Sequence, residues 1–149
     1  GDGSGMIEND SDGASSVAEI PTFFGNTFDE AHQLVLEARH YLGERGQRDV
    51  SALGVEGTLA YSVESMRLTA RLTQVMAWLM AMRAVHEGEL SREEVLEKQW
   101  RLGGHDVCLG APTLDVSELP NGLQDLLQRS EQLFVRISRL DEMSGDGEA

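Results

Sequence analysis

Residues 58–87 decide the fold of this chain and read TLAYSVESMRLTARLTQVMAWLMAMRAVHE. The stretch contains no Pro and no Gly, the two residues that most disfavour a helix interior, so it favours one long helix. Its apolar residues fall on more than one side of that helix, and each such side has to be covered by other parts of the protein. We therefore predict that this segment is the central helix of an all-α bundle.

Two apolar patterns run along the segment. The first alternates in steps of four and three, the spacing of a bundle seam, and consists of Leu68, Leu72, Val75, Leu79 and Met82. The second is a flatter stripe of small and flexible side chains: Met66, Ala70, Thr73, Ala77 and Met80. At 1.5 Å per residue the segment is roughly 45 Å long, which exceeds the predicted flanking helices. We predict that the seam lies in the core and that the stripe faces a second copy in a homodimer.

A third line on the same helix is polar. Its members share one face at i, i+4, i+7 and i+11 and are Arg67, Arg71, Gln74 and Trp78. Arg and Trp are frequent anchors at protein–protein interfaces, so these residues are candidates for binding a partner. The alternative is that the arginines pair with acids of neighbouring helices while Trp78 fills the core.

Further helices flank the central one. They are predicted over residues 27–42, 91–102 and 120–143. Capping boxes, in which two side chains satisfy the free amides of a first turn, mark two starts: Thr27 with Glu30, and Ser91 with Glu94. Pro120, a favoured first-turn residue, marks the third. The predicted fold is a three-helix bundle with a long central helix and a short extra helix.

Charge divides the chain into a body and two acidic ends. The formal net charge is −14, but residues 31–140 hold 15 acids and 12 bases, whereas residues 1–30 hold seven acids and no base. Residues 141–149 add four acids and no base. Acidic ends rich in Gly and Ser are typical of disorder. We expect a disordered segment at 1–25, a helical domain at 26–143 and a short flexible tail at 144–149, with a linker at 43–57 and a loop at 103–118.

Composition argues against several classes of function. Nucleic-acid binding needs clustered Lys and Arg, which this acidic chain lacks. No apolar run approaches the roughly 20 residues of a membrane span. The single cysteine, Cys108, allows no intrachain disulfide, and the N-terminus shows no signal-peptide pattern. We expect a cytoplasmic protein that binds neither nucleic acid nor membrane.

No catalytic pattern stands out in the sequence. His105 and Cys108 form an H-x-x-C pair, but a zinc site normally has four ligands. The chain also lacks a G-x-S-x-G nucleophile motif and a Gly-rich phosphate loop. We therefore predict no enzyme activity, no metal site and no cofactor. A metal-dependent enzyme that uses His105, Cys108 and nearby acids is a minor alternative.

The amino-acid sequence of the predicted helices resembles that of a known family. The resemblance lies in residues 59–79 and 83–91, and in Leu119, Pro120, Gly122, Leu123, Leu126, Arg129, Ser130, Arg136, Leu140 and Asp141 of the last helix. These segments resemble the RcdA family, the regulators of CtrA degradation of alphaproteobacteria, over about residues 27–142. The loop at 103–118 departs from the family pattern, and the tail after Met143 is short.

The resemblance implies a cytosolic helical homodimer that serves as a proteolytic adaptor. Such an adaptor works with the ClpX–ClpP protease primed by CpdR. With PopA it promotes the destruction of CtrA, so the implied partners are these proteins and cargo such as CtrA. The alternative is a helical dimeric regulatory or structural protein with no role in proteolysis.

Overall fold

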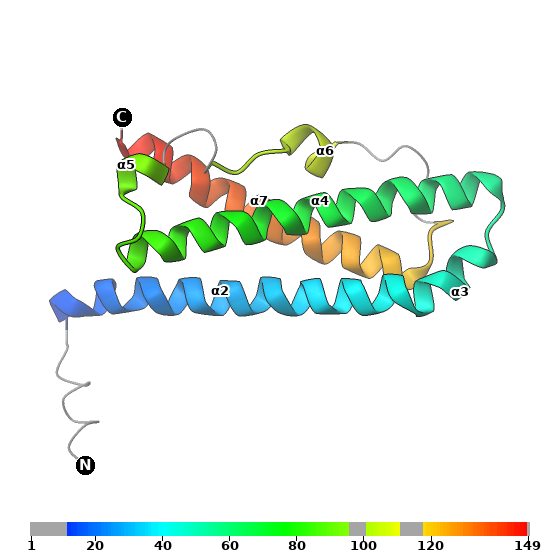
Figure 1. The fold of residues 1–149 in the computed structure, drawn as a ribbon, viewed down its shortest axis with the longest axis horizontal. Helices are drawn as coiled ribbons and strands as arrows, with labels where there is room; N and C mark the ends of the chain where they lie inside the picture. The colour runs from blue at the N-terminus through cyan, green and yellow to red at the C-terminus, as the bar shows by residue number, and fades with distance from the viewer. Residues whose placement is uncertain (1–11, 96–100, 111–117, 149) are drawn as a thin grey trace, which may run out of the picture.

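The computed structural model describes residues 12–95, 101–110 and 118–148, and the side chains of residues 25–94, 101–110 and 118–143. Three long helices run side by side: α2 (Asp12–Gly43), α4 (Val55–His86) and α7 (Asn121–Glu148) (Figure 1). Shorter helices lie in the connections: α3 (Arg45–Ser51), α5 (Arg92–Val95) and α6 (His105–Leu109). Every element in the described ranges is a helix, which confirms the predicted all-α three-helix bundle. No described helix combines the length and apolarity that crossing a membrane requires.

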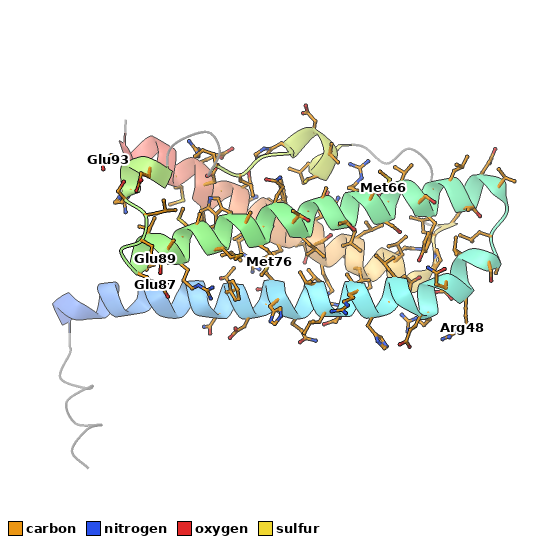
Figure 2. The ribbon with its side chains drawn as sticks, in the orientation of Figure 1. Arg48, Met66, Met76, Glu87, Glu89 and Glu93 are labelled. Atoms are coloured by element: carbon orange, nitrogen blue, oxygen red, sulfur yellow. The ribbon has the colours of Figure 1, made fainter. Side chains whose placement is uncertain are left out.

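The core lies between the three long helices, and α4 packs against both α2 and α7. Its largest contributions are Leu34 and Tyr41 from α2, Leu68, Leu72, Val75 and Leu79 from α4, and Leu123, Phe134 and Ile137 from α7. The predicted seam is therefore confirmed as core, with Met82 partly buried at its end. Met76, on another side of α4, lies between α4 and α2 (Figure 2).

The first helix is longer than predicted. It begins at Asp12 within the described range, and Thr27 lies inside it with its side chain buried, so the predicted cap at Thr27 is wrong. With 32 residues, α2 equals α4 in length. The last helix also runs on to Glu148 instead of ending near Met143, because a helix-interior Gly costs only about 1 kcal/mol. Residues 1–11 of the predicted disordered segment lie outside the described residues.

The segment predicted as a linker, 43–57, contains helix α3. A tertiary contact holds this helix: the Tyr41 hydroxyl donates to the Asp49 carboxylate at 2.8 Å. Burial, and then this bond, raise the pKa of the Tyr41 phenol. Gly46 is buried, and a Cβ there would collide with the Tyr61 hydroxyl. Helical periodicity could not reveal α3, because packing against α2 and α4 stabilises it.

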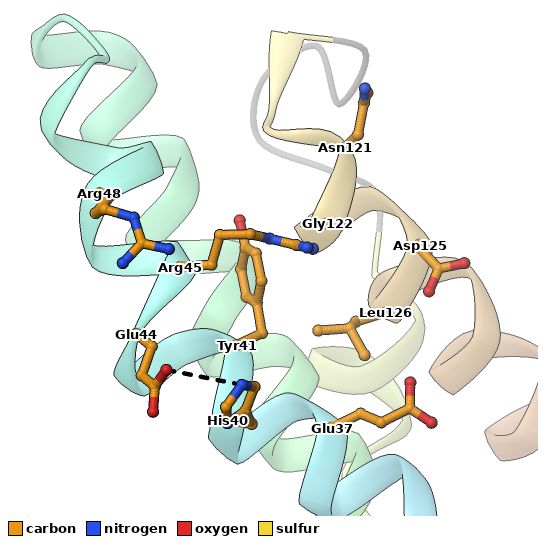
Figure 3. Close-up of a pocket in the computed structure, with 10 residues that line it drawn as sticks. All are labelled: Glu37, His40, Tyr41, Glu44, Arg45, Arg48, Asn121, Gly122, Asp125 and Leu126. Atoms are coloured by element: carbon orange, nitrogen blue, oxygen red, sulfur yellow. Dashed lines mark ion pairs between the residues drawn. The ribbon is translucent and has the colours of Figure 1, made fainter.

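The start of α7 packs closely on the end of α2 and on α3 (Figure 3). A Cβ at Gly122 would collide with the Tyr41 ring and the Arg45 guanidinium, which lies 5.1 Å from the centre of that ring. A cleft of about 510 Å³ remains beside this contact. Acidic and basic side chains alternate around it, and His40 and Glu44 are 3.7 Å apart at its edge.

The capping box before α5 is confirmed. The Ser91 N–H donates to Glu94 Oε1 at 2.7 Å, and the Glu94 N–H donates to Ser91 Oγ at 3.0 Å. The described helix ends at Val95, and residues 96–100 of the predicted helix lie outside the described residues. The segment predicted as a loop, 103–118, contains α6, which lies against α4 and α7 (Figure 1).

Candidate functional site

The polar line of α4 lies inside the molecule. Arg67, Arg71 and Trp78 are only 8%, 5% and 3% exposed, and Gln74 is half-buried. The expectation that this line is a surface is therefore wrong, because α6 and the residues before it cover that face. The alternative predicted that Trp78 fills the core, and the structure confirms this part of it. Among the described residues, however, the arginines bind mostly backbone carbonyls, and Arg67 also pairs with Glu64.

Arg67 binds the end of α6. Its Nη1 donates to the carbonyl oxygens of Val107, at 2.6 Å, and Gly110, at 2.8 Å. Its Nε donates to Glu64 Oε1 at 3.0 Å, one turn away on α4. The last carbonyls of a helix have no partner within that helix, so a buried guanidinium beside them satisfies groups that water cannot reach.

Arg71 joins three helices. Its Nε donates to the carbonyl of Cys108 in α6 at 2.6 Å. Its Nη1 donates to the carbonyl of Leu127 and to Ser130 Oγ in α7, at 2.9 and 3.0 Å. Burial lowers the pKa of Arg71, although a guanidinium stays protonated all the same. One buried cation therefore fixes the relative positions of α4, α6 and α7.

Gln74 and Trp78 extend the same set of bonds toward the end of the bundle. The Gly103 N–H donates to Gln74 Oε1 at 2.9 Å. Trp78 Nε1 donates to Asp141 Oδ1 at 3.0 Å, and Arg101 Nε donates to the same oxygen at 2.8 Å. Arg67, Arg71 and Gln74 thus hold the segment 101–110 on the bundle, and Trp78 shares an Asp141 oxygen with Arg101 of that segment. Direct contact of these residues with a partner stays a prediction.

His105 and Cys108 serve packing in this structure. Cys108 is fully buried, and burial raises the pKa of its thiol. His105 Nε2 lies 3.2 Å from Ser138 Oγ, and its ring meets the Phe134 ring edge-on at 5.4 Å between centroids. In the part of the chain that the structure describes, no group of three or more His, Cys, Asp or Glu is arranged to hold a metal ion.

The second candidate, the apolar stripe of α4, is on the surface. Met66 and Met80 are 70% and 52% exposed, Thr73 and Ala77 are exposed, and Ala70 is half-buried. Met66 lies on the outer side of α4 (Figure 2). Exposed Leu59 and Val63 continue the same four–three spacing toward the N-terminus. The stripe predicted from the sequence ends at Met66, although the unbroken four–three spacing extends to Leu59.

Val107 is a further exposed apolar residue that sequence reasoning missed. It belongs to α6, and its carbonyl is bound by Arg67 of α4. Nothing in the local sequence indicated its position, because it depends on α6 lying against α4. The exposed apolar residues of this region thus come from both α4 and α6.

This geometry defines a class of protein: an all-helical bundle with exposed apolar surfaces. Its described part contains no assembled cluster of metal-binding side chains. A family model described as "Protein of unknown function (DUF1465)" matches residues 17–149, so the chain belongs to the DUF1465 family. A comparison with curated proteins finds no match.

Among solved structures, the chain is similar to RcdA from Caulobacter crescentus CB15. The two are 42% identical, the match covers 81% of this chain and 89% of that chain, and the TM-score is 0.66. The resemblance to the RcdA family that the helices carry is therefore confirmed.

Proposed function

We propose that this protein is a non-enzymatic adaptor that helps deliver cell-cycle proteins such as CtrA to the ClpX–ClpP protease. The observation that carries the proposal is the likeness to RcdA over most of both chains, at 42% identity. The structure adds two supporting features. Its buried polar residues on α4 bind the protein's own backbone, and its exposed apolar residues on α4 are available for contact.

An adaptor acts by holding two proteins at once. Binding the cargo and the protease together raises the effective concentration of one near the other, without any chemical step of its own. The proposed partners are ClpX–ClpP primed by CpdR, together with PopA and CtrA, all in the cytoplasm. A rigid helical bundle suits this role, because surfaces on well-packed helices stay fixed relative to one another.

The test is a reconstituted degradation assay with ClpX–ClpP, CpdR, PopA and CtrA. We expect added protein to shorten the half-life of CtrA in a concentration-dependent manner. At excess protein, degradation should slow again, because cargo and protease then occupy different adaptor molecules. An unchanged half-life at every concentration contradicts the adaptor function for this cargo. Recovery of a stable partner without any protease component would favour the alternative, a dimeric regulatory or structural protein.

We also propose that the protein is a homodimer and that the stripe from Leu59 to Met80 forms the interface. The stripe keeps four–three spacing over seven positions, the pattern by which two helices pack along a shared seam: 59, 63, 66, 70, 73, 77 and 80. Its small residues, such as Ala70 and Ala77, allow close approach, while Met66 and Met80 adapt to a partner surface. Sedimentation at micromolar concentration tests the oligomeric state.

A further inference from the structure

A polar cleft between α4 and α7 is lined by Glu64, whose carboxylate has one buried oxygen without a hydrogen-bond donor. The cleft has a volume of about 450 Å³, and Glu64 is one of its lining residues. The Glu64 side chain is only 5% exposed. Its Oε1 accepts from Arg67 Nε at 3.0 Å, whereas its Oε2 is buried and has no partner. Buried acceptors are nearly always satisfied, so this one calls for a donor.

The two cations that line the cleft direct their described bonds to other acceptors. Arg67 donates to Glu64 Oε1 and to two carbonyls of the α6 segment. Arg71 donates to the Cys108 carbonyl and to two acceptors on α7. Neither bond set includes Glu64 Oε2, so a donor for this oxygen would have to come from outside the described protein.

The rest of the lining offers further acceptors. Glu131, on the exposed side of α7, is not within ion-pair distance of a cation in the described structure, although its charge acts on Arg71 of the same cleft. The side chain of Gln128 adds an amide oxygen. The acids of the described residues are not arranged as metal ligands, which favours an organic cation with several N–H donors. A volume of 450 Å³ falls in the range of about 300–1,000 Å³ that is usual for ligand sites.

From the unpartnered oxygen of Glu64, a residue that lines this cleft, we propose that the cleft binds an arginine side chain of a partner protein. The planar guanidinium suits a buried carboxylate, because it donates in fixed directions and is less strongly hydrated than an ammonium group. Glu131 attracts the same group on the exposed side. The net charge of −14, most of which lies at the two ends of the chain, favours the approach of a basic partner segment.

The test uses the full chain and the probe peptide acetyl-Gly-Arg-Gly-amide. Its neutral control carries citrulline, which keeps the shape of Arg and loses the charge. We expect the Arg peptide to shift the backbone amide resonances around Glu64 saturably at low salt, and the citrulline peptide to bind at least about tenfold more weakly. Equal binding of the two peptides, or no shift with either at millimolar concentration, overturns the proposal.

Matched variants locate the site. Glu64→Gln replaces the unpartnered oxygen or its neighbour by a donor and should weaken binding of the Arg peptide about tenfold or more. Glu131→Gln, an exposed change that leaves the core intact, should weaken it a few-fold in a salt-dependent manner. Glu142→Gln makes the same charge change on α7 outside the lining and should have no effect. An equal loss in Glu142→Gln overturns the proposal, and so does unchanged binding in Glu131→Gln.

A free diamine is the other source of a cationic group. Putrescine that binds more tightly than the Arg peptide, with the same dependence on Glu64, contradicts a protein side chain as the occupant. If Glu64→Gln lowers helical content, the Glu131 variant and the citrulline peptide still decide the outcome. The titration contains no protease, so its failure leaves the proposed role in proteolysis untouched, and failure of the degradation assay leaves this site untouched.

Discussion

The two faces of α4 reverse the usual relation between polarity and burial. The face with Arg67 and Arg71 is inside the protein, while the face with Met66 and Met80 is exposed. The polar face is buried because the α6 segment supplies backbone carbonyls that match the guanidinium donors. The apolar face is exposed because no described part of the chain covers it. The difference shows that burial on this helix follows available partners and not side-chain polarity alone.

The strongest test of the comparison is Arg71→Ala. We expect the free energy of unfolding to fall by about 3 kcal/mol, because three buried acceptors on α6 and α7 lose a donor at about 1 kcal/mol or more each. The melting temperature should fall on the order of 10 °C. Thermal unfolding measures the loss, and hydrogen exchange should show faster opening of α6. Arg71→Lys keeps the positive charge but loses the planar set of guanidinium donors. Its melting temperature should lie between those of wild type and Arg71→Ala.

A normal melting temperature in Arg71→Ala, combined with lost partner recruitment, would instead restore Arg71 to the role that the sequence suggested. The stability measurement and a pull-down therefore have to be made on the same variant. Arg67→Ala offers a parallel case, since the two carbonyls that it is described as binding, those of Val107 and Gly110, belong to the α6 segment.

The opposite face is tested by the double change Met66→Glu and Met80→Glu. Two charges that meet a partner helix without counterions should weaken a homodimer at least about 100-fold. The free energy of unfolding of the monomer should change by less than about 0.5 kcal/mol, because both side chains are exposed. Sedimentation measures the first quantity and denaturant unfolding the second.

The matched control is Gln132→Glu, which adds a charge to an exposed position on α7 instead of α4. It should leave the sedimentation coefficient unchanged. A wild-type protein that sediments as a monomer, or a double variant that stays dimeric, contradicts the proposed interface.

The sequence predicted what depends on nearest neighbours along a helix. The core seam from Leu68 to Leu79 and the capping box at Ser91 both follow from spacing of three or four residues, and both are confirmed. It could not place Arg67 or Arg71, because their partners lie about 40 or more residues away along the chain. The same periodicity describes an exposed arginine and a buried one. Only the position of α6 distinguishes them.

The unpartnered oxygen of Glu64 was likewise out of reach of the sequence. A Glu three residues before an Arg on a helix is typical of a solvent-exposed pair. Its burial results from packing between α4 and α7, which brings Glu64 and Gln128 to the same cleft. The stripe from Met66 to Met80, in contrast, could be predicted from the sequence. Its residues share one side of α4 because of their spacing within that helix, and no other segment is needed to identify them.

The ionisation of the Cys108 thiol reports whether the α6 segment, which the polar line binds, stays packed on the bundle. Burial raises the pKa of this thiol in the folded protein. The stability that this shift contributes is complete below the unfolded thiol pKa of about 8.5 and is lost as the pH rises above it, by at most about 1.4 kcal/mol per pH unit. The free-energy difference between wild type and Cys108→Ala should therefore narrow from pH 7.5 to pH 10. A constant difference, together with rapid native-state alkylation of the thiol, would show that the segment opens readily.

The smallest expected effect comes from an arginine that is exposed instead of buried. Arg129 donates to both carboxylate oxygens of Glu37, at 2.7 and 3.0 Å, but the two side chains are 40% and 37% exposed. Because water screens such a pair, Arg129→Ala should lower the free energy of unfolding by only about 0.5–1 kcal/mol at pH 7, and by less in high salt.

The hydrogen bond from Arg129 lowers the pKa of Glu37, so the contribution of this pair is present above the unfolded Glu pKa of about 4.3 and is lost as the pH falls through the folded value. Denaturant unfolding of Arg129→Ala and Glu37→Gln between pH 2.5 and pH 7 measures this loss, and the two variants should converge with wild type at the acid end. The Arg71→Ala deficit should persist there, because its acceptors are carbonyl and hydroxyl oxygens that do not titrate. Equal losses from Arg71→Ala and Arg129→Ala at pH 7 would mean that the buried carbonyls of α6 and α7 find water when the guanidinium is removed, and burial of the polar line would then contribute little to the stability of the bundle.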